Sequence, residues 1–589
     1  MYHSQEHLNS ASSVSARSLA DFSAVSTPSA AVNGKSAVKE HADSDVPAIK
    51  DKPIHRRLWF SCIICALASA VASAAFLPQQ SLWTDEAVQL AGLQLNPIEV
   101  TQWLSGVAQN DFGIPDDRMP PLSYWVGWGW SRIFGLSERS LRWLSVVATV
   151  LATATVCAVA HSVWGFRPAI AGGLLFALSP NVIYQAVEIR AYALLMLAAA
   201  GAFACLLKFA TTPVADRHAR MGWLAGMTGC SILSLYLHFF GVVICGACLL
   251  ASFIVTWREG AQVLPIVLAG SICVISAIGI LPFLKSSISK SAPTPGLSQP
   301  SGDVQTTSKA QGLAKLMLRQ VCHGAMLGSR PILVVSLVGA GVAGLAALLP
   351  GRKAGAGTDA LVLAIGSGLL VTGAAYIAQT SFDASSPRYS VWILPGLMLL
   401  FGSGVEATSS WPRWLALLGV VLLLIGEAYA LTLFVFRGSA FAHTAYGPIE
   451  ARIHRYGVDR VALVFEGDMN QAVHIYTPAR YEFRGKLHQY SYDPEASRTG
   501  ATRVREALRS QEEPVDPAVL PFELLIVVSP EQVDSLGVVR QLNYGIDTRP
   551  DGPVARALLA SHGWERVEED TFLAYVTAHV DVFKRVGDR

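Results

Sequence analysis

Long apolar runs alternate with more polar segments of varying length from Leu58 to Phe436. Most of these runs are long enough to cross a bilayer, because about 20 helical residues at 1.5 Å each match its roughly 30 Å apolar thickness. The sequence therefore predicts a polytopic α-helical membrane protein with about 11 transmembrane helices. The expected spans are Leu58–Leu77, Leu141–Val163, Ala169–Val187, Ala191–Ala210, Met221–Leu237, Phe239–Trp257, Val263–Leu284, Pro331–Leu349, Ala360–Ala378, Val391–Val405 and Trp414–Phe436.

The pattern differs at the two ends of the chain. Residues 1–57 are rich in Ser and Ala and lack a periodic apolar stripe, so they are expected to form a disordered tail. Residues 437–589 alternate between strand-like and helix-like runs, which predicts a small α/β domain after the transmembrane domain of residues 58–436. The expected elements of this domain are strands at Val461–Phe465 and Leu524–Val528, a helix at Val554–His562, and a closing strand pair at Leu573–Val576 and Val580–Phe583.

The distribution of Lys and Arg predicts how the chain is oriented. Lys52, Arg56 and Arg57 precede the first expected span, and alternate loops after it are also basic, as the positive-inside rule requires of cytoplasmic loops. With an odd number of spans, the N-terminal tail is then cytoplasmic and the C-terminal domain extracytoplasmic. We therefore expect a multi-pass protein of the cell's inner (plasma) membrane.

The composition agrees with a membrane protein and argues against a nucleic-acid-binding protein. The chain is 52% hydrophobic and 15% charged, whereas about 25% charged residues is usual in soluble domains. Its formal net charge is +2, and no basic patch is interleaved with aromatic residues. Nucleic acid is therefore not an expected partner.

Two adjacent carboxylates, Asp85 and Glu86, follow the first expected span and emerge at the outer membrane face. Carboxylates placed there can take a proton, bind a cation or steer a polar ligand, although they can also simply favour a helix N-terminus. The predicted orientation puts further ionisable side chains on the same side. Some of them could have a purely structural role instead of a functional one, as an ion pair at the membrane interface or as an arginine that reaches out to the interface. These side chains are Glu188, Arg190, His238 and Arg388.

Five short motifs carry these residues. In their order and common sidedness they resemble the GT-C class of membrane glycosyltransferases, and within it the bacterial protein mannosyltransferase and aminoarabinose transferase superfamily. The match covers residues 58–436, and one departure is Met119, where many members carry His. The motifs are Asp85-Glu86, Pro120-Pro121-Leu122-Ser123-Tyr124, Glu188-Ile189-Arg190-Ala191-Tyr192, Tyr236-Leu237-His238-Phe239-Phe240 and Arg388-Tyr389.

The resemblance implies a polyprenyl-phosphate-linked sugar donor, a membrane lipid, and an extracytoplasmic acceptor that is a glycan, a lipid or a protein. It also implies a single displacement that inverts the anomeric carbon. Asp85 is the expected general base, and Glu86 is expected to orient the acceptor or bind a cation. No cofactor is certain, and a divalent metal cation stays open, because two carboxylates alone do not specify one.

The other expected site residues fall into two groups. Guanidinium groups match phosphate oxygens, so the first group is expected to bind the donor phosphate, with tyrosines adding hydrogen bonds. The second group holds candidates for binding substrate or a metal. The first group is Arg190, Tyr192, Arg388 and Tyr389, and the second is Glu188, His238 and Arg118.

Two alternatives belong to other classes of protein. A transporter or flippase of a lipid-linked envelope precursor would also have many spans, but such proteins usually show internal repeats and broken helices near mid-membrane. No convincing repeat is present here, and the acids cluster near the outer face. The second alternative is a non-catalytic scaffold whose outer domain binds cell-wall polymer.

Overall fold

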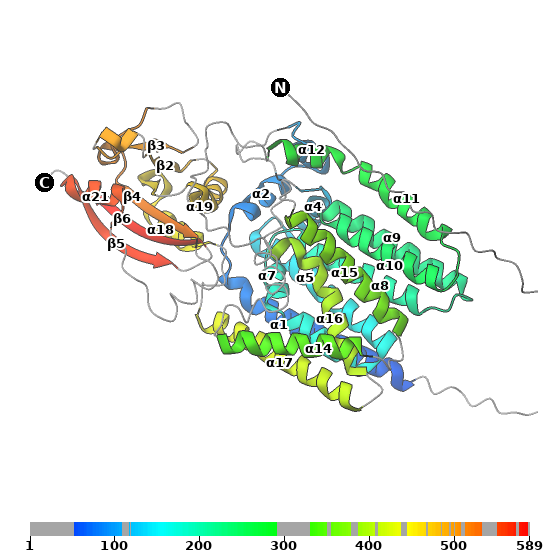
Figure 1. Ribbon diagram of the computed structural model, residues 1–589. Coiled ribbons are helices and arrows are strands. Elements are labelled where there is room, and N and C mark those ends of the chain that lie inside the picture. Colours follow the sequence, from blue (N-terminus) through cyan, green and yellow to red (C-terminus); the bar gives the residue numbers. More distant parts are fainter. Residues whose placement is uncertain are drawn as a thin grey trace, which may run out of the picture. The chain divides into compact units, whose positions relative to one another are not determined.

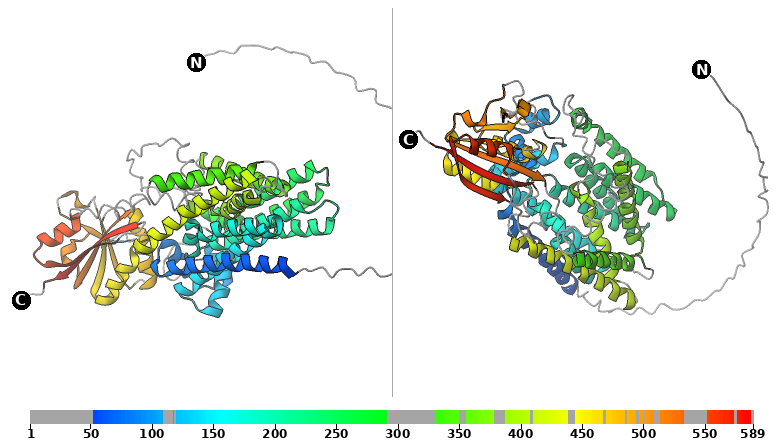
Figure 2. Two further views of the ribbon diagram at one scale, coloured as in Figure 1. Left: turned by 90° about the horizontal axis from the view of Figure 1, so that it is seen from below. Right: turned by 60° about the vertical axis from the view of Figure 1, so that its left-hand side comes forward.

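The structure is a computed structural model of the 589-residue chain. It describes residues 52–108, 117, 119–290, 330–349, 355–377, 387–406, 410–437, 444–466, 469–484, 486–493, 496–499, 501–507, 513–532, 551–572 and 576–586. The long helices between α1 and α17 run side by side, and the strands form a sheet of their own (Figures 1 and 2). The expected tail of residues 1–57 falls largely outside the described residues.

In the described part of the chain, the expected apolar runs lie on helices, and some of the runs extend over more than one helix. Their bounds are α1 Lys52–Phe76, α5 Glu138–Trp164, α6 Phe166–Leu178, α7 Pro180–Ala186, α8 Tyr192–Thr211, α9 Arg217–Leu237, α10 Gly241–Arg258, α11 Leu264–Ile278, α12 Leu281–Lys290, α14 Arg330–Leu348, α15 Gly355–Ile377, α16 Leu394–Ser403 and α17 Ser410–Arg437. Short helices between them are η1 Leu77–Gln79, α2 Thr84–Leu93, α3 Pro97–Leu104, α4 Leu122–Phe134, η2 Pro387–Ile393 and η3 Gly404–Glu406.

The number of helices that can cross a membrane by length and composition is smaller than the sequence predicts. Among the described residues, six qualify alone: α1, α5, α8, α10, α15 and α17. The pairs α6/α7 and α11/α12 qualify only together, because they bend by 59° and 53°. Pro180 at the start of α7 explains the first bend, since proline cannot continue a helix but suits its first turn. The described part of the chain thus holds six to eight such spans, as expected of a multi-pass membrane protein.

The remaining apolar runs form α9, α14 and α16, which pack among these spans. Small residues permit the close packing. A Cβ atom on Gly172 of α6 would lie 2.9 Å from the carbonyl oxygen of Met398, and one on Gly402 would lie 2.9 Å from the backbone nitrogen of Gly172. The backbones of α6 and α16 thus touch, and larger residues at these glycines would force the two helices apart.

The C-terminal domain contains a six-stranded mixed sheet in the order β3-β2-β1-β4-β6-β5. Strand β1 is parallel to β2 and β4, with Leu463 opposite Ile526, and the other pairs are antiparallel. The elements are α18 Tyr446–Tyr456, η5 Val458–Arg460, β1 Val461–Phe465, α19 Met469–Glu482, β2 His488–Tyr492, η6 Ala496–Thr499, β3 Val504–Glu506, η7 Pro517–Val519, β4 Leu524–Gln532, α21 Pro553–Ala560, β5 Trp564–Phe572 and β6 Val576–Arg585.

The sequence predicted β1, the first part of β4 and most of α21, but the closing strand pair was wrong in part. The pair is formed by β5 and β6, and β5 ends at Phe572. Residues 573–575, where the first closing strand was expected, lie outside the described residues. Strand β5 escaped prediction because it lies at the sheet edge and reads Trp-Glu-Arg-Val-Glu-Glu-Asp-Thr-Phe, with almost no apolar alternation.

Candidate active site

Helix α2 carries Asp85 and Glu86 in its first turn. Carboxylates are favoured there by the helix dipole, but neither of these side chains caps the helix, because Trp83 is the N-cap residue and makes no side-chain cap bond. Instead each carboxylate binds an arginine from another part of the chain. A favourable interaction with the helix dipole therefore explains why the two acids lie at the start of α2. It does not explain their side-chain contacts, which are with arginines.

Asp85 faces two arginines that belong to different motifs. Its Oδ2 atom accepts a hydrogen bond from Nη1 of Arg388 at 2.9 Å and lies 3.8 Å from Nη2 of Arg190. The guanidinium of Arg388 also lies 5.3 Å from the ring centroid of Trp83. The side chains of Asp85 and Arg388 are each 26% exposed, so a polar ligand can reach both.

Arg190 is buried and held from two directions. Its Nη1 atom donates to the backbone oxygen of Asp85 at 3.1 Å and to Oδ2 of Asp117 at 2.7 Å. The hydroxyl of Tyr124, at the start of α4, donates to the same Asp117 oxygen at 2.8 Å. The Arg190 side chain is only 5% exposed, so these contacts fix its guanidinium beside Asp85.

Glu86 points away from Asp85 into the protein. Its Oε2 atom accepts from Nη2 of Arg142 on α5 at 2.8 Å, and its Oε1 atom accepts from the backbone N–H of Ile189 at 2.8 Å. Burial raises the pKa of Glu86 to about 8, against the nearby Arg142, which lowers it. With both oxygens engaged, Glu86 fastens α2 to α5 and to the junction between α7 and α8.

That junction carries Glu188, which is also buried. Its backbone oxygen accepts from the Ser145 hydroxyl at 2.5 Å, while Arg142 donates to the backbone oxygen of Val187 at 2.9 Å. The Glu188 charge adds, less strongly than burial, to the raised pKa of Glu86. Helix α5 therefore fixes the backbone from which Arg190 projects.

His238 lies at the C-terminal end of α9 and is buried against Tyr192, with ring centroids 5.5 Å apart. Its Nδ1 atom accepts from the backbone N–H of Phe240 at 3.1 Å. Burial, together with the charges of Arg190 and Arg388, lowers the pKa of His238 to about 3. The imidazole is therefore neutral, and with Nδ1 as acceptor its proton is on Nε2.

The structure thus brings Asp85, Arg190 and Arg388 into contact and places His238 and Tyr192 beside them. Arg118 lies outside the described residues, as does the side chain of Tyr389. Met119 is 5% exposed.

Sequence reasoning missed two residues of this cluster, Asp117 and Arg142. Asp117 belongs to an acid pair just before the Pro-Pro motif, a signal that could have been read. Arg142 begins an apolar run and has the pattern of an ordinary interfacial arginine, so nothing in its neighbourhood indicated its buried pairing with Glu86.

A metal ion held jointly by Asp85 and Glu86 stays a prediction. The two carboxylates are bound to different arginines, and both oxygens of Glu86 accept hydrogen bonds from the protein. Within the described ranges, the acidic and histidine side chains close enough to share an ion are Glu450, His454 and Glu482 of the C-terminal domain, two of which are exposed.

The comparisons with known proteins agree with this description of the fold. No family model matches the chain, and no curated protein matches it. Its helical part and C-terminal sheet form a GT-C glycosyltransferase-like fold, as the motifs predicted. The crystal structure of ArnT from Cupriavidus metallidurans in the apo state has this fold, with a TM-score of 0.50 and 16% identity over 87% of this chain and 97% of that chain.

Two further solved structures are more distantly similar. ArnT from the same organism bound to undecaprenyl phosphate gives a TM-score of 0.49 and 14% identity, over 90% of this chain and 98% of that one. The Archaeoglobus fulgidus oligosaccharyltransferase complex with Zn and sulfate gives 0.41 and 12%, over 71% and 61%. At these identities the likeness to ArnT defines the fold and leaves the reaction to be argued from the site.

Proposed function

We propose that this protein is a glycosyltransferase that moves a sugar from a polyprenyl-phosphate-linked donor to an extracytoplasmic glycan, lipid or protein. The observation that carries the proposal is the partly exposed pair of Asp85 and Arg388, each 26% exposed. The other carboxylates of the cluster are nearly inaccessible, at 10% for Asp117 and 1% for Glu86. Among these, Asp85 is the acid that a substrate can reach.

Arg388 and Arg190 suit a donor phosphate. Their guanidinium groups converge on one oxygen of Asp85, at 2.9 and 3.8 Å, so an anion of similar size can take the place of that carboxylate between them. Guanidinium forks bind phosphate oxygens in pairs. Fixed cations there stabilise the negative charge that grows on the phosphate as it leaves. The neutral His238 supplies a further N–H donor.

The donor phosphate then releases Asp85 for proton transfer. The acceptor hydroxyl attacks the anomeric carbon and forms the new C–O bond, while the bond from that carbon to the phosphate oxygen breaks. The hydroxyl proton passes to Asp85, and the lipid phosphate leaves with the bonding pair. Because attack and departure occur on opposite faces, one displacement inverts the anomeric carbon. Glu86, with both oxygens engaged, acts as a positioning residue for α2.

The lipid-linked nature of the donor follows from where the site lies. With the orientation that Lys and Arg predict, Asp85 lies at the outer face of the inner membrane, where nucleotide sugars are not expected. A donor with a polyprenyl tail suits a site at the ends of apolar helices. ArnT, whose fold this chain shares, has been crystallised with undecaprenyl phosphate, and that ligand supports the same donor class here.

The test uses the full chain in proteoliposomes with a panel of undecaprenyl-phosphate sugars carrying mannose, arabinose, aminoarabinose, galacturonate or glucose. An envelope extract from a strain that lacks the gene serves as acceptor. The readouts are release of undecaprenyl phosphate and the arrival of labelled sugar in the extract. We expect one donor to react and Asp85→Asn to lower the rate at least about 10²-fold.

The matched control is Asp359→Asn. Asp359 is an exposed acid near the start of α15, just after its first turn, so this variant also removes a carboxylate near a helix start. It should keep the parental rate. Full activity of Asp85→Asn at normal expression would overturn the mechanism. Movement of intact lipid-linked sugar across the bilayer without transfer would instead favour the flippase alternative.

A further inference from the structure

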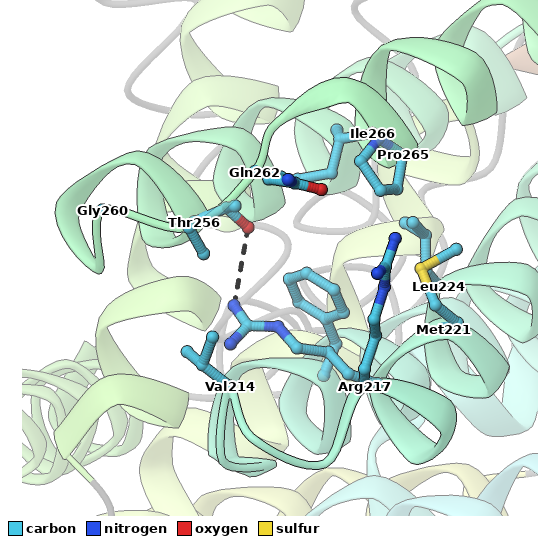
Figure 3. A pocket seen from close by; sticks show the side chains of 12 residues that line it. Val214, Arg217, Met221, Leu224, Thr256, Gly260, Gln262, Pro265 and Ile266 are labelled. Carbon is cyan, nitrogen blue, oxygen red and sulfur yellow. Dashed lines mark hydrogen bonds between the residues drawn. The ribbon is translucent and has the colours of Figure 1, made fainter.

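A cavity lies at the N-terminal end of α9, opposite the end that meets His238. It has a volume of about 320 Å³ and is bounded by the end of α8, the first turns of α9, the end of α10 and the start of α11 (Figure 3). Helix α9 is 21 residues long, about 30 Å at 1.5 Å per residue, and its far end meets His238. The cavity is therefore separate from the candidate active site.

Two arginines line this cavity. Arg217 is exposed at the start of α9, and Figure 3 shows its side chain running toward Pro265. Arg220, one turn further, is 6% exposed. Both lie in a basic segment between expected spans, which the positive-inside rule places on the cytoplasmic side.

The Arg220 guanidinium is only partly satisfied. Its Nη2 atom pairs with Glu259 and lies 3.5 Å from the Thr256 hydroxyl, and the group lies over the Phe209 ring at 4.4 Å. Its Nη1 atom is buried and has no hydrogen-bond partner among the described residues. A buried charged donor is costly to leave unpaired, so this atom indicates a missing acceptor.

The charge balance favours an anion as that acceptor. Glu259 offsets one of the two arginines, which leaves one positive charge at the cavity. An acceptor that is negatively charged satisfies Nη1 and neutralises Arg217 at the mouth. Phosphate oxygens suit both groups, because each guanidinium presents parallel N–H bonds.

The surface beside the cavity is apolar. Leu264 and Leu268, four residues apart on one face of α11, are 63% and 56% exposed, and Trp257 at the end of α10 is 70% exposed. Leu and Trp exposed on apolar helices face lipid, and Trp prefers the level of the head groups. If the anion between Arg217 and Arg220 is the head group of a phospholipid, its acyl chains can lie along the apolar face of α11.

We propose that this cavity binds the phosphate head group of an anionic membrane phospholipid, with Arg220 and Arg217 as its ligands and the acyl chains along α11. Basic pockets between transmembrane helices on the cytoplasmic side are suited to such head groups. The site is independent of sugar transfer and remains testable if the proposed function fails.

The experiment measures lipid binding to the full chain by native mass spectrometry after delipidation in detergent. Phosphatidylglycerol is the anionic probe, phosphatidylcholine the zwitterionic one, and inorganic phosphate the free anion. We expect retained phosphatidylglycerol adducts that weaken about fivefold in Arg217→Gln, in line with the worth of one basic residue at an anionic surface. Arg217→Gln leaves the Arg220–Glu259 pair in place, so loss of folding does not obscure the result.

The control is Arg167→Gln, another exposed arginine on the predicted cytoplasmic side, which should bind phosphatidylglycerol like the parent. Arg220→Gln should weaken binding at least as much as Arg217→Gln. Equal adducts in the parent and both cavity variants would overturn the proposal. If inorganic phosphate binds in an arginine-dependent way and phosphatidylglycerol does not displace it, the ligand of the cavity is a free anion and not a lipid head group.

Discussion

The Nη1 atom of Arg388 lies 2.9 Å from the Oδ2 atom of Asp85, although 303 residues separate the two. The helix after the first span and the turn before α16 therefore meet at one point. Because both side chains are partly exposed, water weakens their attraction, and such pairs contribute at most about 1 kcal/mol to folding. The pair therefore matters for chemistry more than for stability, because it places a cation and a base within reach of one substrate.

Replacing Arg388 should harm activity far more than stability. We expect Arg388→Ala to lower kcat/KM for release of undecaprenyl phosphate about 10²-fold, because the leaving phosphate loses one fixed cation. Arg388→Lys should recover part of that loss, since it keeps the charge but not the planar fork. The melting temperature in detergent should change little. Parental kcat/KM in Arg388→Ala would remove Arg388 from the phosphate site.

The sequence predicted most of the helices, and three of the side chains that it placed on one side of the membrane lie together in the structure. Apolar runs locate helices because a segment inside a bilayer has no water to bind, and a helix satisfies the hydrogen bonds of its own backbone. Motif order then put Asp85, Arg190 and Arg388 on one side. The specific pairs could not be predicted in this way, since Glu86–Arg142 and Asp117–Arg190 join positions 56 and 73 residues apart. Such pairs depend on how the helices pack.

Asp117 should act as a positioning residue for Arg190. In Asp117→Asn the buried Arg190 loses its closest carboxylate, at 2.7 Å, and turns toward Asp85. The tighter pair with Asp85 withholds the base, so we expect kcat to fall more than KM rises. Breaking a buried ion pair costs about 3–5 kcal/mol, so the melting temperature should also fall.

Tyr124→Phe provides the comparison for that variant. It removes only the hydroxyl that donates to Asp117 at 2.8 Å and keeps the ion pair. A single hydrogen bond contributes about 0.5–1.5 kcal/mol, so both losses should be smaller than in Asp117→Asn. If Tyr124→Phe reduces kcat as much as Asp117→Asn does, the hydroxyl itself has a role that positioning does not explain.

Glu86 should make stability depend on pH. Its pKa is raised to about 8 in the fold by burial, with Glu188 and Glu138 adding to the rise and Arg142 opposing it. Unfolding restores an ordinary value near 4.5, so the folded chain holds the extra proton between these values. The stability that Glu86 contributes is therefore full below about pH 4.5 and is lost as pH rises toward 8.

Glu86→Gln, which mimics the protonated acid, tests that pH dependence. The melting temperature of the variant should fall less between pH 5 and pH 8 than that of the parent, whatever the offset at pH 5. Comparing slopes cancels the other titrating groups, because they are common to both proteins. Parallel slopes would show that Glu86 is ionised throughout this range.

Gly92 of α2 should tolerate no side chain. A Cβ atom there would lie 2.4 Å from Cζ3 of Trp103 and 2.5 Å from Cε1 of Tyr124, and both rings are fully buried. We expect Gly92→Ala to cost about 1–3 kcal/mol through overpacking and to lower the melting temperature. It should also reduce sugar transfer, because the displaced Tyr124 ring carries the hydroxyl that holds Asp117 beside Arg190.

Gly129→Ala on α4 is the matched control, since nothing lies within 4 Å of its Cβ position, and it should keep the parental stability and rate. Equal behaviour of the two variants would mean that α2 and α4 do not pack closely through Gly92.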